Sequence, residues 1–211
     1  MLTQQPLQEF LDNLAGDTAV PGGGSVAATA GAMAAALVSM VCNLTIGREK
    51  YAAVEAQMQE TLTRSEALRR RLTELVEEDV AAFNAVMNAF KLPKQTEEEK
   101  EARRAAIQEG YKQATIVPLE TARACAELIR LAKTVIENGN PNAASDGGVA
   151  VLCAQAGLKG AALNVLINLS SIKDQAFVSE HQAALDDILA EHDALAHDVY
   201  QTLKSGFIGV E

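Results

Sequence analysis

The sequence contains no tryptophan, and aromatic residues make up only 4% of its 211 positions, whereas hydrophobic residues make up 48%. Such a composition favours helices packed through Ala, Leu and Val over an aromatic-rich β-sandwich. Positive charge is also scarce, because 18 Lys and Arg stand against 28 Asp and Glu and leave a net charge of −10. Nucleic acids and anionic membrane surfaces attract cationic proteins, so we expect neither as a partner.

Cysteine is rare, and its pattern does not suggest disulfide bonds. Cys42, Cys125 and Cys153 are odd in number, widely spaced and set in apolar segments, and the sequence has no Cys-x-x-Cys motif. These features predict reduced thiols in the core of a cytoplasmic protein. None of the three has the obvious basic neighbours that would lower a thiol pKa for catalysis.

Charge is missing altogether from residues 18–47. The stretch 26–46 is just long enough to span a bilayer. However, its Ala-rich body is weakly apolar, no Lys or Arg precedes Arg48 to anchor it, and no basic region marks a signal peptide. We therefore predict a buried central helix and no membrane association.

Apolar residues recur every three or four positions through most of the chain, which predicts α-helices. These helices cover residues 3–14, 25–46, 49–90, 96–138 and 145–169, and a sixth begins near Asp174. The helices 25–46 and 145–169 are almost free of charge, so we expect them at the centre with the amphipathic helices around them. We predict an all-α antiparallel bundle of about six helices, in a single domain over residues 1–211, with one helical face shared in a homodimer.

Familiar catalytic and metal-binding patterns are missing. His181, His192 and His197 all lie in the last predicted helix, but their spacing does not place two ligands one turn apart, so we expect no metal site there. The sequence also lacks the nucleophile elbow of hydrolases, the P-loop and a dinucleotide-binding fingerprint.

The segment Pro21-Gly22-Gly23-Gly24-Ser25 precedes the first charge-free helix. Glycines let a backbone approach a ligand closely, and Ser25 is a good residue to cap the helix. The free N–H groups of a helix start can bind an anion or a carbonyl group. A loop that merely begins a tightly packed helix explains the same residues.

Asp79 falls on the apolar stripe of the helix 49–90, one turn from Leu75 and one turn from Phe83. A carboxylate that faces a core needs hydrogen-bond partners or takes up a proton. A desolvated acid with a raised pKa is suited to moving protons near neutral pH. The structural alternative is an acid bonded to a facing hydroxyl or amide.

Other polar residues are weaker candidates. Ser145 or Asp146 is expected to cap the helix 145–169, and Asp146 could also touch a ligand. Asn164 and Asn168 share one face of that helix, where their amides either bind a polar substrate ring or join two helices. The cations Arg48, Lys91 and Lys94 lie at the two ends of the helix 49–90, so only neighbours or a second subunit could bring them together.

Several of these segments occur in an order that resembles the cyclodeaminase half of formiminotransferase-cyclodeaminase and its free-standing bacterial relatives, the methenyltetrahydrofolate cyclohydrolases. The resemblance covers nearly the whole chain. Its motifs are Phe10-Leu11, Pro21-Gly22-Gly23-Gly24-Ser25-Val26, Asp79 within the stretch 75–83, Lys91-Leu92-Pro93-Lys94, Val117-Pro118-Leu119, Gly139-Asn140, Ser145-Asp146 and the stretch 164–169 from Asn164 to Leu169.

The resemblance implies an all-helical dimeric enzyme that acts on the one-carbon bridge between N5 and N10 of tetrahydrofolate. A cyclodeaminase closes formiminotetrahydrofolate to methenyltetrahydrofolate with loss of ammonia. A cyclohydrolase adds water to the methenyl carbon and opens the ring to 10-formyltetrahydrofolate. Because no formiminotransferase domain is attached, we expect the cyclohydrolase reaction, with the cyclodeaminase as the alternative. A non-catalytic folate-binding protein and a purely structural bundle are the competing hypotheses.

The family's catalytic acid maps onto Asp79, which we expect to act as general acid and base. By the same resemblance, Pro21 and the backbone from Gly22 to Ser25 line the folate pocket. The remaining residues take two roles: Ser145, Asp146, Asn164 and Asn168 orient the pterin or the intermediate, and Lys91, Lys94 and Arg48 meet the glutamate tail. We expect no metal and no redox cofactor.

Overall fold

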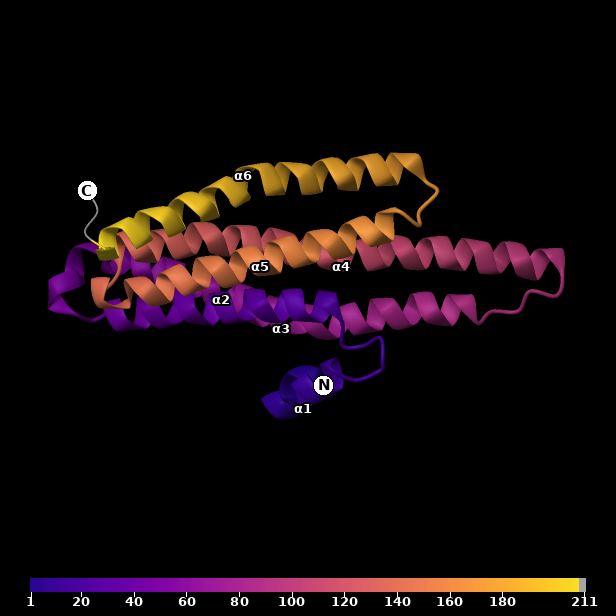
Figure 1. Cartoon of the computed structure of the whole chain (residues 1–211), viewed down its shortest axis with the longest axis horizontal. Coiled ribbons are helices and arrows are strands. Elements are labelled where there is room, and N and C mark those ends of the chain that lie inside the picture. The colour runs from indigo at the N-terminus through magenta and orange to yellow at the C-terminus, as the bar shows by residue number, and fades with distance from the viewer. Residues whose placement is uncertain (209–211) are drawn as a thin grey trace.

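The structure is a computed structural model that describes residues 1–208, and within that range all regular structure is helical (Figure 1). The prediction of an all-α fold with six helices is confirmed. In chain order the elements are η1 (Leu2–Gln4), α1 (Leu7–Leu14), α2 (Gly23–Thr45), η2 (Glu49–Val54), α3 (Glu55–Phe90), α4 (Glu97–Asn138), η3 (Pro141–Ala143), α5 (Ala144–Leu169) and α6 (Gln175–Ile208).

The two apolar helices α2 and α5 pack side by side and run in opposite directions, with α3 and α4 against them. Their close approach depends on glycine. A Cβ atom on either Gly31 or Gly157 would lie 2.7 Å from the Sγ atom of Cys125, so α2, α4 and α5 meet where side chains are absent. Cys125 is fully buried at this junction. The junction of α2, α4 and α5 is therefore built from small residues, in keeping with the composition.

The long helices α3 and α4 form an antiparallel hairpin that extends past the start of α2 (Figure 1). Helix α4 starts where the sequence predicted, and Thr96 and Glu99 form a capping box there. Farther along the hairpin, the guanidinium group of Arg71 binds Glu78 on its own helix and Glu120 on α4. These contacts fix the register of the α3 segment that carries Asp79.

Three predicted helix starts are wrong. The first helix does not run from residue 3, because Pro6 separates a short 3-10 turn from α1. Helix α2 begins at Gly23 with Gly22 as its N-cap, so Ser25 lies inside the first turn and caps nothing. The segment 49–54 is a 3-10 helix interrupted at Tyr51, whose φ and ψ are not helical, and α3 begins only at Glu55.

The expected cap of α5 is also absent. Pro141 begins a 3-10 turn that is capped by Asn140, and α5 follows from it at Ala144 without a side-chain cap. Ser145 and Asp146 therefore lie in the first turn of the helix, not before it. The cause is the proline, which starts helical backbone earlier than the sequence pattern suggested.

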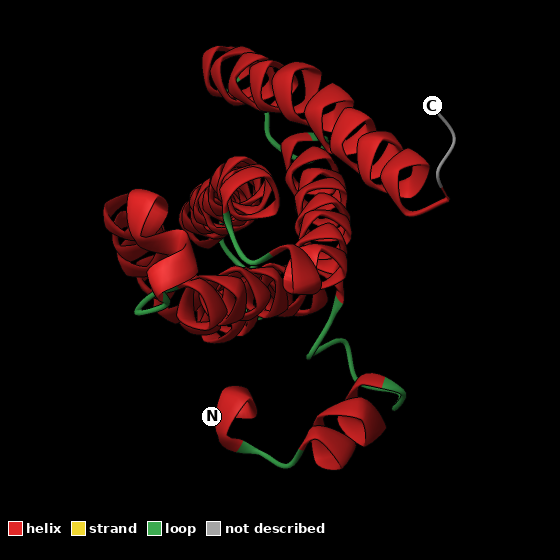
Figure 2. Cartoon of the chain, turned by 90° about the vertical axis from the view of Figure 1, so that its left-hand side faces the viewer, coloured by secondary structure: helices red, strands yellow, loops and turns green. Residues whose placement is uncertain are grey.

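Helix α1 stands apart from the bundle at the N-terminal end of the chain (Figure 2). It contains no buried residue, and Leu7 is 71% exposed. The sequence places Leu7, Phe10, Leu11 and Leu14 on one apolar face. That face is therefore largely uncovered within a single chain.

Helices α2 and η3–α5 are each long and apolar enough to cross a membrane by length and composition alone. The core residues of a water-soluble bundle pass the same test, and 56% and 44% of the two apolar windows are buried inside the protein. The remaining faces carry exposed apolar side chains, including Met33 on α2 and Leu163 and Ile167 on α5. These faces are what a partner surface would have to cover.

Candidate active site

A pocket of about 320 Å³ lies where the start of α2, the second half of α3 and the end of α5 meet. Its polar wall contains Gly22, Gly23, Gly24, Asp79, Asn164 and Asn168. The tertiary structure thus brings together six of the residues that the sequence singled out. They come from three helices that are far apart in the chain.

Among the described residues that line the pocket, two are ionisable: Asp79 and Tyr111. Burial raises the pKa of the Asp79 carboxyl group, because an ionised carboxylate loses hydration there. The hydroxyl and the backbone N–H of Ser25 oppose that rise, because both favour the ionised form. The side chain is half-buried, so it can hold a proton and still reach a ligand.

Ser25 is fully buried and does not line the pocket. Its hydroxyl donates a hydrogen bond of 2.9 Å to Oδ2 of Asp79 and lies 3.4 Å from the carbonyl oxygen of Val76 on the same helix. The predicted capping role of Ser25 is therefore replaced by another one. Its side chain orients the carboxylate from behind.

Gly24 is required by the position of the carboxylate. A Cβ atom at this residue would lie 2.0 Å from Oδ1 of Asp79, far inside van der Waals contact. A Cβ atom at Gly23 would instead approach the Asn164 side chain at 3.4 Å, which is ordinary contact. The glycine-rich segment is thus a close approach of the α2 backbone to Asp79, and the N-terminal end of α2 points its partial positive charge at that acid.

The amide nitrogen of Asn168 has a structural role. Pro118 lacks an N–H group, so it leaves the carbonyl oxygen of Ala114 without its usual partner one turn earlier in α4. The side-chain Nδ2 of Asn168 donates to that oxygen at 2.7 Å. The amide of Asn164 donates to the carbonyl oxygen of Gly160 in its own helix at 2.8 Å. Both residues line the pocket, and the side-chain hydrogen bonds that they make within residues 1–208 use Nδ2, which leaves Oδ1 available to a ligand.

Arg48, Ser145 and Asp146 lie at the opposite end of the bundle. Tyr51 and Thr45 both bond to Asn140 there, which ties the end of α2 to the start of α5. At 1.5 Å per residue, the length of α2 puts this end about 30 Å from the pocket. Ser145 instead borders an apolar hollow formed with Tyr200, Leu203 and Phe207 of α6. One chain alone does not bring these three residues to Asp79.

Lys91 and Lys94 are exposed in the connection between α3 and α4. They directly follow Phe90, which closes the apolar end of the pocket. Pro21 is buried beside the glycines and does not line the pocket. The structure therefore places both lysines just beyond the pocket, on the side away from Asp79.

The sequence prediction missed the apolar wall of the pocket, which is made by Phe83, Val86, Met87, Phe90 and Tyr111. The periodicity of α3 suggested that its apolar residues were core. However, α2 begins only near Asp79, so the later turns of α3 lie beyond it and Met87 and Phe90 are each 41% exposed. The one available signal was helix length: α3 and α4 are much longer than α2, so α2 cannot cover them along their whole length.

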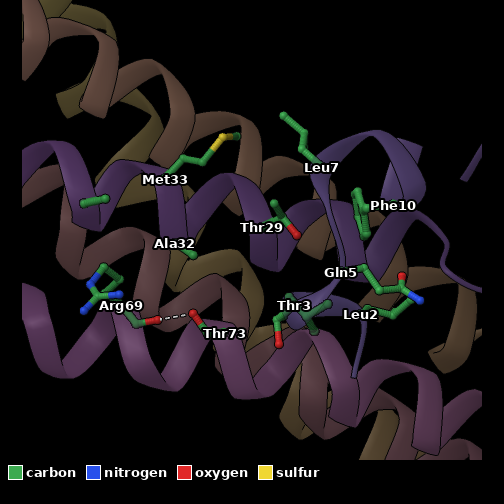
Figure 3. Close-up of a pocket in the computed structure, with 12 residues that line it drawn as sticks. Leu2, Thr3, Gln5, Leu7, Phe10, Thr29, Ala32, Met33, Arg69 and Thr73 are labelled. Carbon is green, nitrogen blue, oxygen red and sulfur yellow. Dashed lines mark hydrogen bonds between the residues drawn. The ribbon is translucent and has the colours of Figure 1, made fainter. Parts of the chain in front are cut away.

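A second hollow of about 360 Å³ lies between the N-terminal segment and helices α2 and α3 (Figure 3). Its apolar surface comes from Leu2, Phe10, Met33 and Val76. Among the described residues that line this hollow, Arg69 is the one that carries a charge. The guanidinium group of Arg69 is bound to Glu66 at 2.7 Å. None of the described residues that line it is an acid, so it offers no counterpart to Asp79.

The cysteines and histidines do not form a second site. Desolvation raises the pKa of Cys42 to about 11 and of Cys125 to about 12, so these buried thiols are poor nucleophiles. No group of three His, Cys, Asp or Glu side chains within residues 1–208 is arranged to hold a metal ion.

The sequence model of the formiminotransferase-cyclodeaminase family matches residues 6–187. This chain belongs to that family. It is 54% identical to the methenyltetrahydrofolate cyclohydrolase of Methylorubrum extorquens, over 97% of this chain and 99% of that protein. The predicted resemblance is therefore confirmed.

Other members of the family align with the same residues. The chain is 39% identical to the formimidoyltransferase-cyclodeaminase of Sus scrofa, over 97% of this chain but only 38% of that longer protein. The crystal structure of formiminotetrahydrofolate cyclodeaminase from Thermotoga maritima superposes with a TM-score of 0.88 at 32% identity, covering 99% of this chain. Proteins named for both reactions are thus similar to this chain over nearly its whole length.

Proposed function

We propose that this member of the formiminotransferase-cyclodeaminase family hydrolyses methenyltetrahydrofolate to 10-formyltetrahydrofolate. The observation that carries the proposal is a half-buried Asp79, held by Ser25 at the start of α2 and open to a pocket of ligand size. The 54% identity to a cyclohydrolase over nearly its full length favours hydrolysis over deamination.

In the proposed mechanism, Asp79 begins as the carboxylate and acts first as a general base. It removes a proton from water as the water oxygen attacks the methenyl carbon between N5 and N10. The resulting tetrahedral carbon carries a hydroxyl group. Asp79 then donates its proton to N5 while the bond between carbon and N5 breaks, and the hydroxyl proton leaves to solvent as the formyl group forms on N10. General acid and base catalysis of this kind contributes about 10²- to 10⁴-fold in rate.

The rest of the pocket supplies orientation. The free oxygen atoms of Asn164 and Asn168 can accept hydrogen bonds from the amino and ring N–H groups of a pterin, while the backbone of Gly22 to Gly24 offers donors. The hydrogen bond from Ser25 favours the ionised form of the carboxylate and holds its orientation. Lys91 and Lys94 lie where an anionic glutamate tail would leave the pocket.

The alternative function is the cyclodeaminase reaction, which the similarity to the Thermotoga maritima enzyme supports. In that reaction N10 attacks the carbon of the protonated formimino group, and Asp79 takes the proton from N10. Asp79 then returns this proton to the amino group of the tetrahedral carbon, which leaves as ammonia. The same acid serves both reactions, because each passes through a tetrahedral carbon between two nitrogen atoms. A non-catalytic folate-binding protein would have no need for an acid held in this way.

We also propose that the protein is a homodimer that pairs through α2 and α5. The exposed side chains of α5 recur at alternating spacings of three and four residues, from Val149 and Leu152 to Leu163 and Leu166. Lys159 is the one charged residue along this stripe within α5. Such a long apolar face with a single charged residue suits a second copy of the same face.

The proposed dimer would also explain a binding role for Arg48, Ser145 and Asp146. A twofold axis perpendicular to α2 and α5 would place the distal end of one copy over the pocket of the other. Arg48, Ser145 and Asp146 would then approach the pocket from the second copy, which no single chain allows. A role for these three residues in binding is therefore proposed only for the dimer.

The reaction is a hydration and a proton transfer, so we propose that it needs no metal or redox cofactor. The buried free thiols and the net charge of −10 support a cytoplasmic protein without nucleic-acid or membrane partners.

Absorbance tests the reaction directly. Methenyltetrahydrofolate is followed with and without the protein in a buffer where spontaneous hydrolysis is slow, and faster loss of its absorbance is the expected result. Ammonia release from formiminotetrahydrofolate, without faster hydrolysis, would make the protein a cyclodeaminase. Saturable binding of tetrahydrofolates without either reaction would contradict both enzymatic proposals.

A further inference from the structure

The pocket is a groove that follows one face of α3 from an acid to an aromatic ring. Asp79, Phe83, Met87 and Phe90 are spaced by three or four residues, so they lie one above another along the helix. Eleven residues separate Asp79 from Phe90, which corresponds to about 16 Å along the axis. The groove is therefore elongated, and its two ends differ in chemistry.

The aromatic end is fixed by contacts that leave one side of it open. The guanidinium group of Arg103 lies 5.5 Å from the centre of the Phe90 ring, and its N–H groups donate to the Phe90 carbonyl oxygen at 3.0 and 3.1 Å. Tyr111 meets the same ring edge to face, with the ring centres 6.3 Å apart. Phe90 is still 41% exposed, so part of the ring remains free on the groove.

We propose that this aromatic end, made of Met87, Phe90 and Tyr111, binds the aminobenzoyl ring of the substrate and thereby fixes its direction in the groove. The inference rests on the proposed function. In a folate the reacting carbon is attached to N10, N10 is attached to the aminobenzoyl ring, and the glutamate follows. Helix α3 presents an acid, then an apolar and aromatic wall, then Lys91 and Lys94, in the same order.

The opposite direction is less favourable. It would place the polar pterin ring against Met87 and Phe90 while the amides of Asn164 and Asn168 faced the apolar part of the substrate. Unpaired amide oxygens in a desolvated pocket cost free energy, and so do pterin N–H groups without acceptors. The negatively charged glutamate would also point towards Asp79, and the two carboxylates would repel each other.

The experiment uses p-aminobenzoylglutamate as a competitive inhibitor of methenyltetrahydrofolate hydrolysis. Replacement of Phe90 by Ala is expected to raise the KM of the substrate and the inhibition constant of p-aminobenzoylglutamate together, by about tenfold, with little change in kcat. Phe90→Tyr keeps the ring and is expected to restore both constants. The matched control is Leu92→Ala, which removes an equally exposed apolar side chain outside the groove.

Two results would overturn the inference. If Phe90→Ala left both constants unchanged, the aromatic end would not contact the substrate. If the variant weakened inhibition by a tetrahydropterin without a benzoyl group, but not by p-aminobenzoylglutamate, the substrate would lie in the opposite direction. Failure of the wild-type protein to turn over either folate would instead contradict the proposed function, and calorimetric binding of p-aminobenzoylglutamate would then test the groove independently.

Discussion

Replacement of Asp79 by Asn is the sharpest test of the site, because it removes the proton carrier and almost nothing else. Asparagine has nearly the same shape, and its oxygen can still accept the 2.9 Å hydrogen bond from Ser25. The close contact with the backbone at Gly24 also remains. The variant should therefore fold and bind folate.

The expected loss of rate follows from the role of the acid. Removal of a general acid and base lowers kcat by about 10²- to 10⁴-fold, which corresponds to about 3 to 5 kcal/mol of transition-state stabilisation. The KM of the substrate should change only a few-fold, since the amides, the glycine backbone and the aromatic wall are untouched. The assay is the loss of methenyltetrahydrofolate absorbance under multiple turnover.

Stability should change in the opposite direction from activity. Because burial raises the pKa of Asp79 above the unfolded value of 3.8, the native state binds this proton more tightly than the unfolded chain. Asp79 therefore contributes less stability as the pH rises through the interval between 3.8 and the raised pKa. An asparagine has no such dependence, so the variant should gain stability relative to wild type as the pH rises, and should be at least as stable near pH ~7.

Urea unfolding near pH ~4 and pH ~7 measures this difference. The control is Asp187→Asn, which removes an exposed carboxylate on α6, far along the chain from the pocket. It should leave kcat unchanged. An Asp79→Asn enzyme with kcat within a few-fold of wild type would refute the proposed role of this acid.

Three further predictions concern the same architecture. Ser25→Ala removes a hydrogen bond to the ionised form of Asp79, so the pKa of that acid should rise further. The acidic limb of the pH profile of kcat/KM should then move to higher pH. An unchanged profile would exclude Ser25 as a residue that lowers the pKa of Asp79. Gly24→Ala should displace the Asp79 carboxylate and lower kcat by about tenfold or more. It should also destabilise the fold by about 1 to 3 kcal/mol in urea unfolding. Gly206 has open space around it, so Gly206→Ala should change neither kcat nor stability. Leu163→Glu places a charge on the exposed stripe of α5 and should convert a dimer into monomers in sedimentation velocity; a wild-type protein that sediments as a monomer would contradict the proposed dimer.

The position of Asp79 shows what a helical pattern can and cannot reveal. Its place on the apolar stripe of α3 was visible in the sequence and correctly predicted a desolvated acid with a raised pKa. The partner of that acid was not visible, because Ser25 lies 54 residues earlier. Local rules assigned Ser25 to a helix cap, whereas the early start of α2 at Gly23 turned its hydroxyl towards α3.

The apolar stripe itself was overinterpreted as core for a related reason. Periodicity reports which face of a helix is apolar, but not whether another helix covers that face. Phe83, Met87 and Phe90 belong to turns of α3 that lie beyond the start of α2, so they line a groove instead. In the same way, nothing local to Pro118 indicated that Asn168 would bond to the carbonyl oxygen it frees.

The sequence by itself determined the helical class, most helix ends, the charge-free central helices and the place of Asp79 on the apolar stripe of α3. These depend on side-chain periodicity, capping and burial, which act over a few residues. Only the tertiary structure decided which residues meet: it joined Asp79 to Gly24, Ser25 and Asn168, and it separated them from Arg48, Ser145 and Asp146. The physical reason is that α2 and α5 are long and antiparallel, so the starts of these two helices lie at opposite ends of the bundle. A sequence motif at each helix start does not reveal this separation.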